Sequence, residues 1–518
     1  LFSLQSFRDP FSQSGLTGSM RDYYRENSYG QFDLDGVVAS WHTVSQPYRH
    51  YANNDGIPNT SDDWGLGSGV KAFIREALAL ADPGLDFSEF DTDGDGFVDA
   101  FFVVHAGPGA EELFTTKPND HFNYFWSHQS AVHYQTNDGV VVGTYTMEPQ
   151  NGTIGVFCHE YGHVLGLPDL YDTGNRSSEG IGEWGLMASG GWCFAPGDQL
   201  GTTPAHFSAW SKMKLGWLQP VDIRAGVRNM RLPPLAKEAA AVRVWNDVMS
   251  TETTNPTEYF LLENRQNVLF DTGLTRRQVE LGKPQANGLI IYHVNEAKSS
   301  NSNELDKLID VEEASPIFVD NVWIENLDLP RDLSTYQYLT SGNRGDNGDP
   351  FPGYLAWSED LTDYLGERLK NEFSDNTFPG SQASNGQDTH ITIRNIRLEG
   401  EDVLFYLEAD EQLSVSVEDQ DSQVPGSFTL SIYPNPMTDM AQIVLAGNIS
   451  DQHDAKVQVY NLLGQQVREI SISANQTGQT TLFWDGRNQA GARVQSGIYF
   501  IIAKLGSIKL KQKILLTR

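Results

Sequence analysis

Apolar positions in the first 217 residues recur every three to four places in some stretches and form short runs in others. The helical spacing predicts helices over about 69–82 and 153–166. Thr203 as an N-cap, followed by a proline in the first turn, predicts a third helix that Gly216 ends. Helices that alternate with short apolar runs indicate an α/β or α+β domain in this part of the chain.

From residue 218 onward the pattern changes to short β-rich runs separated by Asn, Asp, Gly and Ser. The runs predict strands at 259–263, 288–294, 391–396 and 403–407. This spacing is typical of antiparallel sheets packed as a β-sandwich. We therefore expect a β-rich domain over residues 218–410.

Residues 411–427 are polar, acidic and end in Pro and Gly, which predicts an extended linker. Residues 428–518 then carry 9 Lys and Arg against 5 Asp and Glu, a net charge of +4, whereas the chain before them carries −36. This change predicts a separate C-terminal module with the strand spacing of a small β-sandwich. Its strands are expected at 442–445, 456–461, 497–504 and 508–515. The sequence as a whole therefore predicts a multidomain protein.

The balance of charge limits the partners of the chain. It has 36 Lys and Arg against 68 Asp and Glu, so its net charge of −32 disfavours nucleic acid and anionic lipid as partners. No stretch approaches the ~20 apolar residues of a membrane span, so we expect no transmembrane segment. The chain begins at Leu1 without an initiator Met or a leader pattern, so we expect any signal peptide or propeptide to have been removed or left out of this chain.

The chain has two cysteines, Cys158 and Cys193, which is too few for a disulfide framework. They are compatible with one bridge or with two buried thiols. A bridge would tie the helix expected over 153–166 to a later Gly-rich segment, and both alternatives stay open.

The strongest chemical signal is His159-Glu160-x-x-His163 within a predicted helix. At ~100° per residue the two histidines lie within ~40° of each other, so both imidazoles can bind one cation. They fall on the side of the helix opposite Phe157 and Tyr161, which face the core. A lone histidine is more often a satisfied core or surface residue, but this spacing favours zinc.

A third ligand is expected shortly after the helix. Gly166 can end it in a left-handed conformation, which turns the chain back so that Asp169 can reach the metal. His159, His163 and Asp169 would leave the fourth zinc position open, as catalytic zinc sites require. Glu160 is then placed to take a proton from water and pass it to the leaving amine.

A Gly-rich segment over 180–192 contains a single methionine, Met187. The metzincin proteases pair an extended zinc motif with a later Met-containing turn, and this chain is similar to that pattern with Asp169 in the place of the final histidine. Met187 would then be the Met-turn residue, a hydrophobic floor under the zinc. The alternative is that Met187 is an ordinary core residue, and this interpretation also predicts a buried position.

HEYGHVLGLPDLYD followed by GIGEWGLMASGGW resembles the M6 peptidases, the immune inhibitor A group of secreted bacterial metalloproteases. The resemblance covers about 1–410 and includes four more segments, at 21–32, 207–217, 288–296 and 349–353. It implies a metzincin-like zinc metalloprotease catalytic domain over 1–217 that acts as an endopeptidase on proteins and is made with a propeptide.

The residue that stabilises the oxyanion is left open by the sequence. Some metzincins carry a tyrosine two positions after the Met, where this chain has Ser189. Tyr145, His128 and Tyr171 are the candidates. The segments at 126–128 and 148–149 also resemble M6 motifs.

A calcium loop is predicted in the first domain. Acidic residues alternate along DTDGDGFVD with Gly96 at the sharp turn, which matches positions 1, 3, 5, 6 and 9 of an EF-hand loop. The expected ligands are Asp91, Asp93, Asp95, the carbonyl of Phe97, and Asp99. Position 12 is Phe102 in place of the usual glutamate, so we expect structural Ca²⁺ in a loop without the helix-loop-helix. An acidic surface turn is the alternative.

The C-terminal module contains LSIYPNP, VQVYNLLGQQV, WDG and SGIY, and it ends in a basic tail. These motifs resemble the type A sorting domain of the type IX secretion system over nearly all of 428–518. The resemblance implies export by that machinery, with a secreted or cell-surface location. Without it, the module could be a β-sandwich that binds carbohydrate or protein.

The sequence therefore predicts a secreted zinc endopeptidase that acts on protein or peptide substrates. A catalytically silent surface adhesin or binding protein on a protease scaffold is the alternative from another class, and the intact Glu160 argues against it. A zinc hydrolase of small peptides or other amides is a third possibility. A fold resemblance does not determine the substrate.

Overall fold

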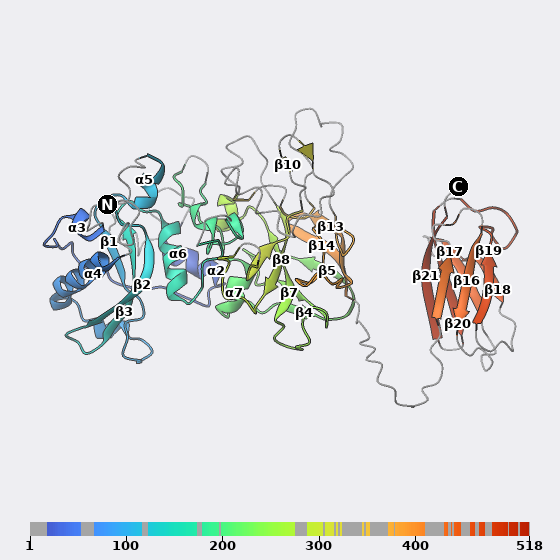
Figure 1. Cartoon of the computed structure of the whole chain (residues 1–518), viewed down its shortest axis with the longest axis horizontal. Helices are drawn as coiled ribbons and strands as arrows, with labels where there is room; N and C mark the ends of the chain where they lie inside the picture. The colour runs from blue at the N-terminus through green and yellow to red at the C-terminus, as the bar shows by residue number, and fades with distance from the viewer. Residues whose placement is uncertain are drawn as a thin grey trace. The chain divides into compact units, whose positions relative to one another are not determined.

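The computed structural model forms two compact units, Leu1–Leu413 and Ser414–Arg518, which are described separately (Figure 1). The predicted linker at 411–427 lies outside the described residues. The structure describes residues 18–516 except for 53–66, 117–122, 174–178, 196–197, 275–286, 304–305, 315–317, 320–321, 324–343, 346–348, 353–370, 378, 410–428, 434–436, 438–439, 447–455, 462–465, 472–478, 496 and 506–507.

The first part of unit 1 is a small sheet with helices on both faces. Its strands are β1 (Phe102–His105), β2 (His128–Gln135) and β3 (Val141–Pro149), in the order β1-β3-β2, with β3 parallel to β1 and antiparallel to β2. Its helices are α2 (Met20–Asn27), α3 (Tyr48–Ala52), α4 (Ser68–Ala81), α5 (Ala110–Thr116), α6 (Ile154–Val164) and α7 (Ala209–Lys214). Helices α4 and α6 confirm the two helices predicted from the apolar spacing.

The alternation of side chains along β1 decides which helix covers which face of the sheet. Phe102 stacks on Phe157 and Tyr161 of α6, with ring centroids 6.4 and 5.6 Å apart. The next residue, Val103, belongs to the core cluster that contains Ile74 of α4. Helix α6 therefore covers one face of the sheet, and α4 covers the other.

The prediction for the start of the third helix was wrong. Helix α7 begins at Ala209 with Ser208 as its N-cap, whose Oγ accepts a hydrogen bond from the Ser211 N–H. The backbone of residues 203–206 bonds to distant segments instead, with the Ala205 N–H donating to the Gly190 carbonyl at 2.9 Å. These tertiary partners outweigh the local N-cap signal at Thr203. The end of the helix was predicted correctly, because Gly216 has φ +74° and follows the last turn.

The second part of unit 1 is built from short strands. They are β4 (Val221–Ile223), β5 (Gly226–Leu232), β6 (Val242–Val244), β7 (Glu258–Arg265), β8 (Gly288–Asn295), β9 (Ile309–Val311), β10 (Phe318–Val319), β11 (Val322–Trp323), β12 (Glu372–Phe373), β13 (Ile391–Glu399) and β14 (Asp402–Ala409). Strands β7, β8, β13 and β14 occupy the four predicted positions.

Most of these strands form two sheets, ordered β4-β6-β7-β8-β9 and β12-β13-β14-β5, while β10 and β11 pair separately. All of their strand pairs are antiparallel except β4 with β6. Phe260 of β7 packs edge-to-face on Phe373 of β12 with centroids 5.1 Å apart, and both belong to the core cluster that contains the buried face of α6. We predicted that this part is a separate β-sandwich domain that begins at residue 218, and this stays a prediction.

Unit 2 contains two antiparallel sheets around a core of its own. Its strands are β15 (Thr429–Tyr433), β16 (Ala441–Ala446), β17 (Lys456–Asn461), β18 (Gln466–Ser471), β19 (Gln479–Trp484), β20 (Gly497–Leu505) and β21 (Ile508–Leu516), in the sheets β15-β16-β19 and β18-β17-β20-β21. Trp484 and Ile501 are buried in the shared core. The four predicted strands correspond to β16, β17, β20 and β21. Among the described helices of the chain, none combines the length and apolar character that a membrane crossing requires.

Candidate active site

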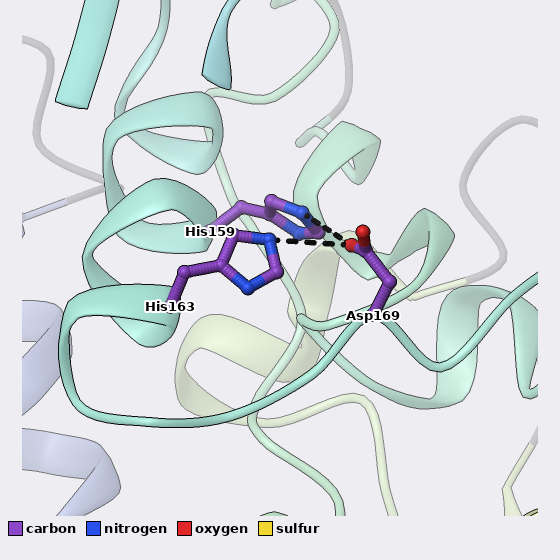
Figure 2. Close-up of side chains that lie close together, drawn as sticks. All are labelled: His159, His163 and Asp169. Atoms are coloured by element: carbon purple, nitrogen blue, oxygen red, sulfur yellow. Dashed lines mark hydrogen bonds and ion pairs between the residues drawn. The ribbon is translucent and has the colours of Figure 1, made fainter. Parts of the chain in front are cut away.

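Helix α6 carries two histidines on the side that is turned away from its buried face. Phe157 and Tyr161 pack in the core, whereas the side chains of His159 and His163 are 15% and 17% exposed. The helix ends after Val164, and Gly166 adopts φ +93° while the Leu167 N–H bonds to the Gly162 carbonyl. This turn brings Asp169 back toward the helix, as predicted (Figure 2).

Backbone carbonyls determine the orientation of both imidazoles. His159 Nδ1 lies 2.9 Å from the Leu186 carbonyl, and His163 Nδ1 lies 2.8 Å from the Leu167 carbonyl. A carbonyl oxygen only accepts hydrogen bonds, so each Nδ1 carries a proton and each Nε2 is the ring nitrogen that faces the ligand position. The two Nε2 atoms lie 3.1 and 3.3 Å from the same Oδ1 of Asp169 (Figure 2).

This arrangement fits a divalent cation. One donor atom from each of His159, His163 and Asp169 lies within 4.8 Å of the other two, and two imidazole nitrogens with a carboxylate oxygen are a donor set typical of zinc. Burial alone would lower the pKa of His159, but its hydrogen bond to Asp169 raises that pKa to about 9. Burial would raise the pKa of Asp169, but the two histidines hold it well below its usual value. The Asp169 carboxylate therefore stabilises positive charge between the two histidines. That charge can come from a proton on an imidazole or from a bound metal ion.

Glu160 lies next to these ligands in sequence but is not part of the ligand group. It is 6% exposed. Burial raises the pKa of its carboxyl group, while the charges of His159 and His163 oppose that rise. A carboxylate that is poorly solvated is a better base than one in water.

A second buried glutamate lies between the sheet and α6. Glu148 of β3 is opposite Val104 of β1, in the row of side chains that faces α6, and it is fully buried. Among the described residues neither of its carboxylate oxygens has a hydrogen-bond partner. Burial, reinforced by the charge of Glu160, raises the pKa of Glu148 well above its usual value. A charged carboxylate is therefore disfavoured at Glu148, behind Glu160.

Met187 is fully buried beneath α6. A Cβ atom on Gly162 would lie 2.4 Å from its sulfur, so the absence of a side chain at Gly162 permits the close approach. The neighbouring Leu186 supplies the carbonyl that orients His159, and the Met187 carbonyl accepts a hydrogen bond from the Leu170 N–H at 2.8 Å. The segment that carries Met187 thus contacts both His159 on the helix and the residue that follows Asp169. Its assignment as a metzincin Met-turn stays a proposal.

Of the three candidates for oxyanion stabilisation, His128 and Tyr145 lie together and Tyr171 lies apart from them. His128 Nε2 and Tyr145 Oη lie 3.0 Å apart, and Tyr145 is buried in the core cluster that contains α4, on the sheet face opposite α6. The ring of Tyr171 lies 6.5 Å from the ring of His159, measured between centroids. The geometry therefore favours Tyr171 as the candidate near the ligand group.

The predicted calcium loop brings three carboxylates together. Asp91, Asp93 and Asp99 have one oxygen each within 4.8 Å of the others, and the Gly96 N–H donates to Asp91 Oδ2 at 3.0 Å. Asp95 is not part of that group; its Oδ1 accepts a hydrogen bond from the Phe97 N–H at 2.8 Å. The loop ends shortly before β1. Calcium binding itself stays a prediction.

Cys158 and Cys193 are both free, buried thiols in the structure. The bridge that the sequence left open is therefore not formed. Burial raises the pKa of each thiol well above its usual value, which disfavours the reactive thiolate.

Two parts of this site were not predicted from the sequence. The carbonyls of Leu186 and Leu167 orient the histidines, but any residue type supplies a carbonyl, so no local signal identifies them. The close packing of Gly162 on Met187 was also not predicted. A signal for it exists in the sequence, because a glycine inside a predicted helix lowers helix stability and often marks a position where another group packs closely.

The sequence was compared with models of known protein families, and two of them match. Residues 1–218 match the family described as the immune inhibitor A peptidase M6 catalytic domain. The N-terminal part of this chain is therefore similar to the M6 peptidases. Residues 431–517 match the secretion system C-terminal sorting domain, which confirms the predicted sorting module and its secreted or cell-surface location.

Two curated relatives match part of the chain. Immune inhibitor A of Bacillus thuringiensis subsp. alesti is 34% identical over 224 residues, which is 38% of this chain and 31% of that protein. The pre-pro-metalloprotease PrtV of Vibrio cholerae serotype O1, strain M66-2, is 31% identical over 241 residues, which is 40% of this chain and 25% of that protein. The chain thus matches about a third or less of the length of these relatives.

Among solved structures, dimeric latent PorU of Porphyromonas gingivalis is 13% identical with a TM-score of 0.17, and the match covers 23% of this chain and 11% of that one. A likeness of this size carries no argument about fold or function.

Proposed function

We propose that the chain is a secreted zinc-dependent endopeptidase of the metzincin type that hydrolyses peptide bonds in proteins. The observation that carries the proposal is the convergence of two histidine Nε2 atoms on one oxygen of Asp169, beside a buried glutamate that is not a ligand. The M6 match of residues 1–218 supports the choice of peptide bonds as substrate.

The proposed ligands are His159, His163 and Asp169. Zinc held by them would polarise the scissile carbonyl and make water more acidic. The carbonyls of Leu186 and Leu167 keep the two imidazoles in the tautomer that leaves Nε2 available.

Glu160 is proposed as the general base and then the general acid. One of its carboxylate oxygens takes a proton from the attacking water, and the same group delivers that proton to the leaving amine nitrogen. Its burial strengthens it as a base. Tyr171 is proposed as the group that stabilises the oxyanion, because its ring lies beside that of His159.

Two further assignments belong to this proposal. The C-terminal sorting domain would direct the protein to the type IX secretion machinery. Asp91, Asp93 and Asp99 would bind a structural Ca²⁺, together with Asp95 and the Phe97 carbonyl as expected from the EF-hand pattern. One oxygen of Asp91 is buried and has no partner among the described residues, which is the environment that a bound cation would satisfy.

The proposal is tested by casein hydrolysis and zinc content of the parent and of Glu160→Gln. We expect the parent to bind zinc and hydrolyse casein, and Glu160→Gln to keep the metal and lose activity by at least about a hundredfold. Glu76→Gln is the matched control, because Glu76 lies on α4 and bonds to Ser45 and Tyr51, away from the ligand group.

Other outcomes would point elsewhere. A parent without bound zinc would contradict the metal site. A parent that binds zinc but has no activity on casein would favour a narrow substrate, hydrolysis of another amide, or the binding-protein alternative.

A further inference from the structure

The backbone of Leu170, the residue after the proposed ligand Asp169, is held from three sides. Its N–H donates to the Met187 carbonyl at 2.8 Å. Its carbonyl accepts hydrogen bonds from the Ile181 N–H at 3.1 Å and from Asn301 Nδ2 at 3.1 Å. The side chain of Leu170 is fully buried, so the direction of the chain at this point is determined by protein contacts.

Asn301 comes from the β-rich part of unit 1, about 130 positions later in the chain. It is fully buried, and its amide is bonded on both sides. Its Oδ1 accepts from the Ile309 N–H at 3.0 Å, and its Nδ2 donates to the Ile309 carbonyl at 2.8 Å. Ile309 begins strand β9, so the amide is anchored to the edge of the five-stranded sheet. One N–H of Nδ2 then remains for the Leu170 carbonyl.

Two more contacts join the same regions. The Trp184 carbonyl, three residues before Met187, accepts from Arg265 Nη1 at 2.7 Å and from the Tyr292 hydroxyl at 3.2 Å. Arg265 and Tyr292 lie on β7 and β8, which belong to the same sheet as β9. The β-rich part therefore holds both the segment of the third ligand and the segment beneath α6.

We propose that Asn301 is a positioning residue for the metal centre: by holding the Leu170 carbonyl, it fixes the backbone from which Asp169 reaches the two histidines. The inference rests on the proposed zinc site. The M6 match ends at residue 218, so this assignment places a determinant of the metal centre outside the matched catalytic region. The metal-binding unit then extends into the β-rich part of the chain.

Asn301 acts on Asp169 through one backbone bond, so its removal should loosen the ligand without removing it. Residues that orient metal ligands typically contribute ten- to a hundredfold in metal affinity. We expect Asn301→Ala to weaken zinc binding by about tenfold and to alter the visible spectrum of the Co²⁺ form, which reports on the geometry of the ligands.

The experiment uses the full chain, with zinc affinity measured by competition with a chelator and with Co²⁺ spectra of the same samples. Asn246→Ala is the matched control. Asn246 is also a buried asparagine of the β-rich part, its Nδ2 donates to the Thr389 carbonyl and its Oδ1 accepts from the Val248 N–H, and neither bond involves the M6 region. Its replacement should cost stability without changing zinc affinity or the Co²⁺ spectrum.

Asn301→Asp keeps the size of the side chain and the acceptor for the Ile309 N–H. This variant replaces Asn301→Ala in the test if Asn301→Ala does not fold. It should weaken zinc binding as well, because a carboxylate cannot donate to the Leu170 carbonyl. Zinc affinity and Co²⁺ spectra equal to those of Asn246→Ala would overturn the inference. A parent that binds neither Zn²⁺ nor Co²⁺ would instead overturn the proposed metal site, and the assignment of Asn301 with it.

Discussion

Gly162 of α6 lies directly over Met187, so closely that a Cβ atom at position 162 would be 2.4 Å from the sulfur. Gly162 is one residue before the proposed ligand His163, and Met187 is one residue after the carbonyl that orients His159. The contact therefore connects the packing beneath the helix to the geometry of the ligands.

Gly162→Ala should destabilise the protein, although the same change inside an unobstructed helix stabilises by about 1 kcal/mol. The new methyl group must displace the buried Met187, and overpacking of a core typically costs about 1–3 kcal/mol. Denaturant unfolding measures this cost. In a Met187→Ala background the cost of Gly162→Ala should shrink, because the clashing atom is gone. Additive costs of the two substitutions would contradict the contact.

Calcium should raise the unfolding temperature of the parent while zinc is kept saturating, because a ligand that binds only the folded state stabilises it. Asp93→Asn should reduce this response, since Asp93 belongs to the group of three carboxylates. Asp35→Asn is the control at an exposed carboxylate outside the loop. An equal calcium response of the parent and Asp93→Asn would contradict the calcium loop.

His293 should contribute stability that is lost as the pH rises. Its Nε2 lies 2.8 Å from Glu258 and its Nδ1 lies 3.4 Å from Glu312. Burial would lower the pKa of His293, but the bonds to Glu258 and Glu312 raise it to about 9. Because the unfolded value is ~6.5, the contribution is fully present below that pH and is lost as the pH rises through about 9.

The difference in unfolding free energy between the parent and His293→Gln isolates this contribution from other titrating groups. It should fall by roughly 3 kcal/mol between pH 6 and pH 9.5. Urea unfolding at both pH values measures it. A difference that stays constant with pH would mean that His293 does not carry the charge.

Cys158 and Cys193 should not react with a thiol reagent in the native protein, since both are buried and burial raises the pKa of each thiol. In denaturant without reductant, two thiols per chain should react. Absence of reactive thiols in the unfolded chain would mean that the two cysteines are bridged.

Local patterns predicted the parts of this protein that depend on neighbouring residues. The helix at 154–164, the two histidines on one side of it and the reversal at Gly166 follow from helical geometry and from the conformational freedom of glycine. The strands at 258–265 and 288–295 likewise follow from local β-rich composition. Spacing along the chain is enough for these features because their partners are few residues away.

The start of the third helix shows where local signals fail. Thr203 and the following proline have the composition of a helix start, yet the backbone there bonds to Gly190 and Cys193. Ser208 caps the helix instead. Hydrogen bonds between segments that are distant in sequence decided this boundary.

The helical repeat is enough to predict which side chains of α6 face the proposed metal position. The contacts that hold them there could not be read from local patterns: the Leu186 carbonyl on His159, the burial of Glu160, and Asn301 on the backbone beside Asp169. Orientation and burial depend on backbone groups and surfaces that come together only when the chain folds. Residue type and spacing do not encode those partners locally.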